Sequence, residues 1–143
     1  MSLTPEQSRF VADHRAAAMI TQGADGLPKP VRIAYQVMDG EIWSSGTQTR
    51  VRTRRLREDP RSTLFIWDPV YDFLSIHCTV EILDGPDAPE LNLRYFRQLQ
   101  GKPTEPLTWM GKDGLDDAGF TRQMVEDQRL IYRFTPVKAF GNG

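Results

Sequence analysis

Hydrophobic and polar side chains alternate with a period of two over much of the chain, and this pattern is typical of β-strands with one buried face. The alternation is clearest from Val31 to Val37, where every second residue is hydrophobic. The predicted strands are Ala16–Thr21, Val31–Met38, Glu41–Ser45, Ser62–Trp67, Phe73–Leu83 and Leu130–Phe134, the last with room to resume after Pro136. The pattern therefore predicts a mainly β protein.

The dipeptide Asp39-Gly40 separates two of these strand patterns and is the strongest local signal in the sequence. Asp-Gly favours a two-residue type I′ turn, because both central residues of that turn need a positive φ. The turn fixes the pairing of the flanking strands, so we expect a hairpin in which Val37 lies opposite Ile42.

Other segments carry the signals of helix ends. Thr4-Pro5-Glu6-Gln7 combines an N-cap, a first-turn proline and a glutamine at the capping-box position, and Asp87-Ala88-Pro89-Glu90 repeats the pattern. The predicted helices are Pro5–Asp13, about two turns after Arg50 that stop before Asp59-Pro60, Asp87–Gln98 and Ala118–Glu126. Glycines and prolines make Gly101–Gly114 a candidate loop or lid. Short antiparallel strands with a few helices predict a small, helix-decorated barrel in one domain, residues 1–143.

Composition describes an ordinary soluble globular protein, with 39% hydrophobic and 26% charged residues in a chain of 143. No apolar run approaches the roughly 20 residues of a membrane span, and no secretory signal opens the chain, so we expect a cytoplasmic protein that does not bind membranes. The single cysteine, Cys78, excludes an internal disulfide and a cysteine-based metal cluster.

Charge is concentrated in one place although the net formal charge is only -1. The segment RVRTRRLREDPR, residues 50–61, holds six arginines and follows a hydroxyl-rich strand end from Ser44 to Thr49. Hydroxyls, loop amides, a helix N-terminus and the guanidinium fork all favour a bound phosphate. The alternative is a solvated basic face, with Arg57 and Arg61 beside Glu58 and Asp59. We interpret the segment as a phosphate-holding site.

The sequence offers little catalytic chemistry of its own. Its two histidines, His14 and His77, are better explained by structure: the first lies near a helix end, and the second neighbours Cys78 on a strand whose adjacent side chains point to opposite faces. No metal-binding spacing occurs, so we assign no metal ligand and no catalytic side chain. An enzyme of this kind would depend on a bound cofactor. Trp67 is the best candidate to stack on a planar ring, because it ends an apolar strand before Asp68-Pro69.

The order of several short segments resembles a known family. These segments are Phe10-Val11 before His14-Arg15, Ala18–Thr21, Asp25–Pro28, Asp39–Trp43, Leu56–Arg61, and Met124–Arg129 with Thr135-Pro136. In this order and spacing the chain resembles the split β-barrel flavoproteins related to pyridoxamine 5′-phosphate oxidase, most closely their branch that uses the deazaflavin coenzyme F-420. The resemblance covers nearly the whole chain.

The resemblance implies a six-stranded split β-barrel of the FMN-binding type with peripheral helices, assembled as a homodimer with two cofactor sites at the subunit interface. It implies that the cofactor ring lies along the strand that starts at Val31. It further implies that the cofactor phosphate is held by the strand end and the helix that follows. The candidate cofactor-binding residues are Val31, Ser44, Ser45, Thr47, Arg50, Arg52, Arg54 and Trp67.

Two departures from the family pattern bear on the cofactor. The family pattern is close to R-x-K-x-R-N-L, whereas this chain has Arg52 in place of the lysine and Arg55 in place of the asparagine. Both changes keep or increase positive charge, which suits coenzyme F-420, whose tail carries phosphate and carboxylates, better than the shorter FMN. Cys78 stands where relatives have a glycine, so the local backbone approach or the neighbouring pocket should differ.

The leading hypothesis is therefore an F-420-dependent oxidoreductase that passes a hydride to a small conjugated or electrophilic substrate. An FMN-dependent oxidase or reductase is the alternative within the same class. A non-catalytic protein that binds a flavin, a haem or a tetrapyrrole is the alternative from another class. We do not expect nucleic-acid binding, because the pI is near 6.1 and the arginine segment lacks interleaved aromatic residues.

Overall fold

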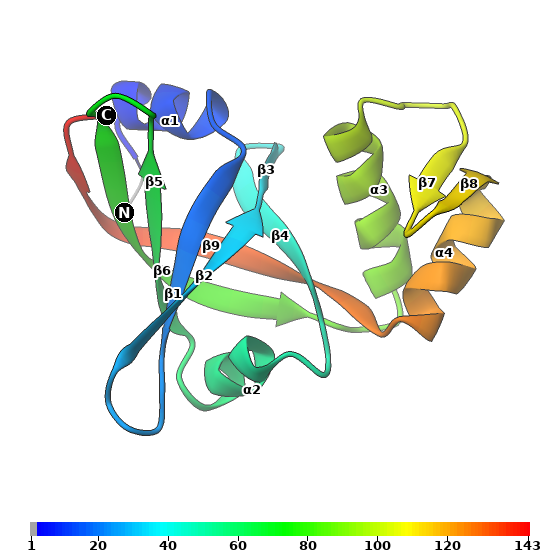
Figure 1. Cartoon of the computed structure of the whole chain (residues 1–143), viewed down its shortest axis with the longest axis horizontal. Helices are drawn as coiled ribbons and strands as arrows, with labels where there is room; N and C mark the ends of the chain where they lie inside the picture. Colours follow the sequence, from blue (N-terminus) through cyan, green and yellow to red (C-terminus); the bar gives the residue numbers. More distant parts are fainter. Residues whose placement is uncertain (1–2) are drawn as a thin grey trace.

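The computed structural model describes residues 3–143, and over that range the chain forms a curled sheet with helices at its ends (Figure 1). The strands are β1 (Ala16–Gln22), β2 (Pro28–Ala34), β3 (Gln36–Met38), β4 (Glu41–Thr47), β5 (Arg61–Trp67), β6 (Phe73–Leu83), β7 (Leu107–Trp109), β8 (Lys112–Leu115) and β9 (Arg129–Gly141). The helices are α1 (Pro5–Ala12), α2 (Val51–Glu58), α3 (Ala88–Gln100) and α4 (Asp117–Glu126). None of these helices is both long and apolar enough to cross a membrane.

The main sheet has the strand order β2-β1-β5-β6-β9-β4-β3, and every pair is antiparallel. Strands β2 and β3 follow each other in the chain yet lie at opposite edges, so the sheet curls round and its two edges meet at Tyr35. The predicted mainly β architecture is confirmed. The predicted number of six strands was wrong, because the expected strand Val31–Met38 is divided in two at Tyr35 and the main sheet has seven.

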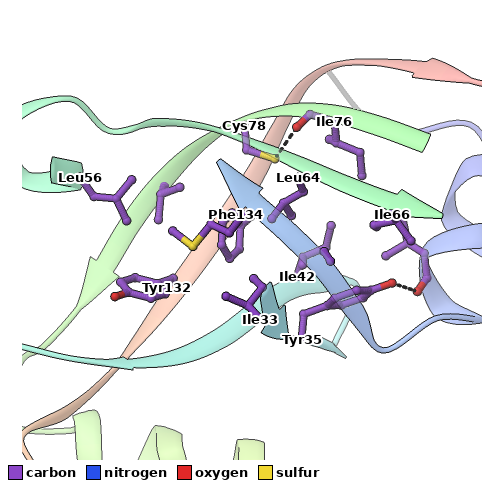
Figure 2. Close-up of a cluster of buried hydrophobic side chains, with 14 of the residues drawn as sticks. Ile33, Tyr35, Ile42, Leu56, Leu64, Ile66, Ile76, Cys78, Tyr132 and Phe134 are labelled. Carbon is purple, nitrogen blue, oxygen red and sulfur yellow. Dashed lines mark hydrogen bonds between the residues drawn. The ribbon is translucent and has the colours of Figure 1, made fainter. Parts of the chain in front are cut away.

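Side chains hold the two edges of the barrel together where the backbone ladder is interrupted. The carbonyl oxygen of Ala34, the last residue of β2, accepts a hydrogen bond from Ser44 Oγ at 2.7 Å and another from Tyr95 Oη at 3.2 Å. Tyr35 points into the barrel, and its hydroxyl donates to the carbonyl oxygen of Val11 at 2.7 Å (Figure 2). The break at Tyr35 depends on these contacts between distant segments, so the alternation pattern alone did not predict it.

Two hydrophobic cores lie on either side of β4. The first fills the barrel, with Leu64, Ile76 and Phe134 at most 2% exposed (Figure 2). The second lies between the outer face of β4 and the group formed by α3, α4 and the β7–β8 hairpin, which Figure 1 shows beside the barrel. Ile42 belongs to the first core and Trp43 to the second, so this strand is buried on both faces.

Several local predictions are confirmed. Helix α1 has the full capping box at Thr4. The Asp39-Gly40 turn has positive φ at both residues, and Val37 pairs with Ile42 as expected. Helix α2 runs for two turns and ends before Asp59. The box predicted at Asp87 does not form, because its side chain makes no cap hydrogen bond, and α3 continues two residues further than predicted, to Gln100.

The segment Gly101–Gly114 is only partly a loop. It contains β7 and most of β8, joined by a tight turn at Met110-Gly111 in which both residues have positive φ. Methionine is not a typical turn residue at such a position, so the sequence carried no signal for this hairpin. The last strand also continues through Pro136 to Gly141, since Pro136 lies opposite Cys78 at a register shift where Val137 of β9 has no partner on β6.

Candidate functional site

An open cleft of about 640 Å³ lies where the end of β4, the start of α2 and the tip of the β7–β8 hairpin meet. Part of its lining is basic and comes from Arg50, Arg52, Arg55 and Arg129. Another part is apolar and comes from Val31, Val51, Trp109 and Met110. Thr47 and Thr49 contribute hydroxyls at the end of the strand. The cleft therefore combines positive charge with an apolar wall.

The arginines of this cleft are not neutralised by carboxylates. Within residues 3–143, no ion pair involves Arg50, Arg52, Arg55 or Arg129. The one acidic residue of the lining, Asp127, accepts hydrogen bonds from neutral donors, Trp109 Nε1 at 2.7 Å and Gln123 Nε2 at 3.1 Å. Arg52 Nε is buried and has no hydrogen-bond partner in the described part of the chain. Buried polar groups normally have a partner, so these side chains indicate an anionic ligand.

Arg129 joins the cleft from β9, where it pairs in register with Thr47 of β4. Its Nη2 and Nε donate to Ser45 Oγ at 2.9 and 3.2 Å, and its guanidinium carbon lies 5.1 Å from the centroid of the Trp109 ring. Burial and then the charge of Arg50 lower the pKa of Arg129, and the charge of Asp127 only partly offsets this. A cation held in such a place is poised to bind an anion.

The start of α2 adds a second feature that favours an anion. Helices α1 and α4 begin with side-chain caps from Thr4 and Asp116, but Arg50 at the N-cap of α2 makes no side-chain cap hydrogen bond. The first turn of α2 contains no acidic residue. Free amide hydrogens and the positive end of the helix dipole therefore lie beside positive side chains, an arrangement that a bound anion would relieve.

The structure brings together four of the predicted site residues, Val31, Thr47, Arg50 and Arg52, in one cleft. Ser45 lies at its edge, where its hydroxyl accepts from Arg129 and donates to Asn92 Oδ1 at 2.5 Å. Reasoning from the sequence did not identify Arg129 as a site residue, because only the pairing of β9 with β4 places it there.

The other three predicted residues lie elsewhere in the chain. Ser44 points to the opposite face of β4 and bonds across the barrel edges to Ala34. Arg54 is exposed, and the lining contains Arg55 instead. Trp67 ends β5, roughly 20 Å along the strand from Arg61, and it is not part of the cleft lining. There its ring stacks on Phe65 with centroids 5.7 Å apart.

Other candidate chemistry is weak. The thiol of Cys78 is buried, and burial raises its pKa to about 12, so it is not a thiolate near neutral pH. No group of three or more side chains suited to a metal ion occurs within residues 3–143. His77 is exposed on the outer face of β6 beside Phe140, and His14 Nδ1 bonds to the carbonyl oxygen of Phe10 at 2.7 Å. Both histidines therefore have the structural surroundings expected from the sequence.

Comparison with known proteins gives a consistent result. A family model described as pyridoxamine 5′-phosphate oxidase matches residues 3–131. A conserved hypothetical protein of Mycobacterium tuberculosis has a similar structure, with a TM-score of 0.75, 24% identity and coverage of 99% of this chain and 84% of that one. Among curated proteins none matches the sequence.

Two further solved structures have the same fold but are described by different functions. An F420 reductase has a TM-score of 0.67 and 19% identity, over 96% of this chain and 98% of its own. A haem storage protein of Vibrio cholerae has a TM-score of 0.64 and 15% identity, over 98% and 94% of the two chains. At such identities the similarity concerns the fold alone.

Proposed function

The chain belongs to the pyridoxamine 5′-phosphate oxidase family, and from that premise we propose that it is an oxidoreductase that uses the deazaflavin coenzyme F-420. The observation that carries the proposal is the set of cleft arginines, Arg50, Arg52, Arg55 and Arg129, which have no carboxylate partner in the described chain. A family that includes oxidoreductases makes redox chemistry the first expectation, and the cleft indicates the kind of cofactor.

The residues present fit the anionic part of such a cofactor. Arg52, with its buried and unpartnered Nε, and the uncapped start of α2 would hold a phosphate. Thr47 would add a hydroxyl from the strand end, and Ser45 would act through Arg129. Val31 and the exposed Val51 offer apolar surface for the remainder of the molecule.

The chemistry itself would come from the cofactor: when bound, the deazaflavin supplies a hydride to a small conjugated or electrophilic organic substrate. The protein binds the cofactor, orients it and shields it from water. We assign no side chain to the chemical step, and the accompanying proton comes from water.

The number and spread of the arginines favour F-420 over FMN. Arg52 and Arg55 are three residues apart on one face of α2, while Arg129 approaches from β9 on the side of Trp109. A single terminal phosphate cannot contact all of them. Coenzyme F-420 carries a phosphodiester followed by a glutamate tail, so its negative charges extend far enough to use the set, with the exposed Arg54 nearby.

Competitive titration of the purified protein with F-420 and FMN tests the proposal, and the quenching of cofactor fluorescence measures the binding. We expect tighter binding of F-420, and a steeper loss of its affinity between low salt and about 0.5 M salt, because exposed charge pairs are screened. Equal affinities or a preference for FMN would favour an FMN-dependent enzyme. Binding of haem in preference to both would favour a storage or carrier protein.

We also propose a homodimer. The outer face of β5 and β6 presents Phe65, Trp67 and Phe73 in a continuous aromatic stack, and Trp67 is 47% exposed. Phe140 on β9 adds a ring that is 50% exposed. Exposed aromatic surface of this kind is typical of an interface, and Trp67 would contact a cofactor only from a partner subunit. Light scattering that finds a monomer at micromolar concentration, still able to bind cofactor, would contradict the dimer.

A further inference from the structure

Tyr132 is a fully buried tyrosine beneath the basic cleft, and it contacts β4, the first turn of α2 and the side chain of Arg52. It lies on β9, and its ring packs flat against the backbone of β4: a Cβ added at Gly46 would lie 2.5 Å from the ring carbon Cζ. Its hydroxyl bonds to Thr53 Oγ1 in the first turn of α2. The guanidinium carbon of Arg52 lies 5.8 Å from the centroid of the Tyr132 ring.

The direction of the hydrogen bonds follows from the number of hydroxyl hydrogens. Thr53 Oγ1 donates its only hydrogen to the carbonyl oxygen of Thr47 at 2.7 Å. Tyr132 must therefore be the donor in its bond to Thr53 Oγ1. The result is a hydrogen-bond chain in which the Tyr132 hydroxyl donates to Thr53 Oγ1 and the Thr53 hydroxyl donates to the carbonyl oxygen of Thr47. This chain ties the first turn of α2 to the end of β4 from inside the barrel.

The position of this chain matters because α2 has no side-chain cap of its own. A helix start is usually fixed by the N-cap side chain, which Arg50 does not provide here. Thr53 and Tyr132, both 0% exposed, supply the missing anchor from beneath. The amides at the start of α2 and the Arg52 side chain consequently face the cleft without any polar cap that a ligand would have to displace.

We propose that Tyr132 is a positioning residue for the anion site, acting through Thr53 and Arg52 and made possible by the glycine at position 46. This inference rests on the proposed function, since it concerns the same cleft. The ring of Tyr132 supports the Arg52 guanidinium, and its hydroxyl fixes the helix turn that carries the amides. Both contacts orient groups that would touch the ligand, while Tyr132 itself is buried beneath them.

The variant Tyr132→Phe removes only the hydroxyl and keeps the ring under Arg52. Binding of F-420, FMN and inorganic phosphate should weaken by about three- to tenfold, the loss expected for one misplaced hydrogen-bonding turn. Tyr35→Phe is the matched control, because Tyr35 is equally buried and donates to a backbone carbonyl at the other side of the same core (Figure 2). It should lower the melting temperature by a similar amount and leave all three affinities unchanged.

Hydrogen exchange tests the positioning without any ligand. In Tyr132→Phe, the hydrogen-bonded amides of residues 53–55 should exchange faster than in the wild type, while Tyr35→Phe should leave them unchanged. Thr53→Ser keeps the hydroxyl, so its ligand affinities and its amide exchange rates should match those of the wild type. Thr53→Val removes the hydroxyl, so its affinities should fall and its amides in the first turn of α2 should exchange faster.

The outcomes separate this inference from the proposed function. If the wild-type protein binds F-420, FMN and phosphate only as weakly as any basic protein surface would, both the proposed function and the positioning role of Tyr132 are wrong. Wild-type binding that Tyr132→Phe leaves intact, with unchanged exchange in α2, would overturn the positioning role alone. Equal losses of affinity in Tyr132→Phe and Tyr35→Phe would show a general effect of stability, and would also count against it.

Discussion

Both ends of the arginine segment, residues 50–61, carry arginines, but these arginines have different surroundings. At its start, Arg50, Arg52 and Arg55 line the cleft and have no acidic partner within residues 3–143. At its end, Arg57 bonds to Asp84 at 2.9 Å, and Arg61 makes a bidentate pair with Asp59 at 2.8 and 2.9 Å. The pairing also shifts the acids: hydrogen bonds from Arg61 lower the pKa of Asp59 to about 2, and hydrogen bonds from Arg57 and then Gln48 lower the pKa of Asp84.

The difference shows that a run of charge is not itself a binding site. For Arg57 and Arg61 the solvated basic face, which the sequence left open as an alternative, is the correct description. Arg52 and Arg55 instead line the cleft, because a helix with 3.6 residues per turn directs residues 52 and 55 to one face and residue 57 to another. Pairing within the fold therefore distinguishes a charge that is already satisfied from one that awaits a ligand.

The sharpest test compares one arginine from each set. Arg52→Ala removes a charge-assisted contact worth about 1.5 to 3 kcal/mol, so affinity for F-420 or FMN should fall by roughly ten- to hundredfold. Arg57→Ala, in the same helix, should leave the affinity unchanged. Circular dichroism checks that both variants are folded. An unaltered dissociation constant in folded Arg52→Ala, or equal losses in the two variants, would remove the distinction between the sets.

A smaller effect is expected at Arg129, because two of its nitrogens already donate to Ser45. Arg129→Met keeps an unbranched side chain against Trp109 and removes the charge, and cofactor affinity should fall by about three- to tenfold. Arg133→Met on the same strand is the control, since Arg133 is paired with Glu81 and Glu41. Isothermal titration of both variants measures the effect, and a loss in Arg133→Met as large as in Arg129→Met would argue against a specific role of Arg129.

The smallest effect concerns the arginines that are paired with acids, Arg57 and Arg61, and is a change in stability that depends on pH. The pKa of Asp84 is lowered in the folded protein, first by its bond to Arg57, so the pair stabilises the fold above the ordinary value of 3.8 and loses this effect as pH falls through the lowered pKa. Both side chains are 35% exposed or more, which keeps the contribution below about 1 kcal/mol. Urea unfolding should therefore show Asp84→Asn less stable than wild type at pH 7, with a difference that shrinks as the pH falls below 3.8 and with unchanged cofactor affinity. A stability difference that did not shrink as the pH fell would mean that charge is not its cause.

Local chemistry was sufficient to predict most of the elements. The Asp39-Gly40 turn, the Thr4 capping box and the end of α2 before Asp59 each depend on a few neighbouring residues, and all three are confirmed. Predictions failed where a distant contact decides the backbone. Tyr35 breaks a strand because two sheet edges meet there, and the Met110-Gly111 turn exists because Leu107 and Trp109 pack into the core beside α3 and α4.

The candidate site divides in the same way. The amino-acid sequence by itself determined that arginines would cluster at the start of a helix after a hydroxyl-rich strand end, because both features are contiguous in the chain. Only the tertiary structure decided which arginines are unpaired, since Asp84, the acidic partner of Arg57, and Ser45, the hydrogen-bond partner of Arg129, lie 27 and 84 positions away. Charge is a property of a residue, but its compensation depends on what the fold brings within a few ångströms, and strand pairing across the whole chain sets that.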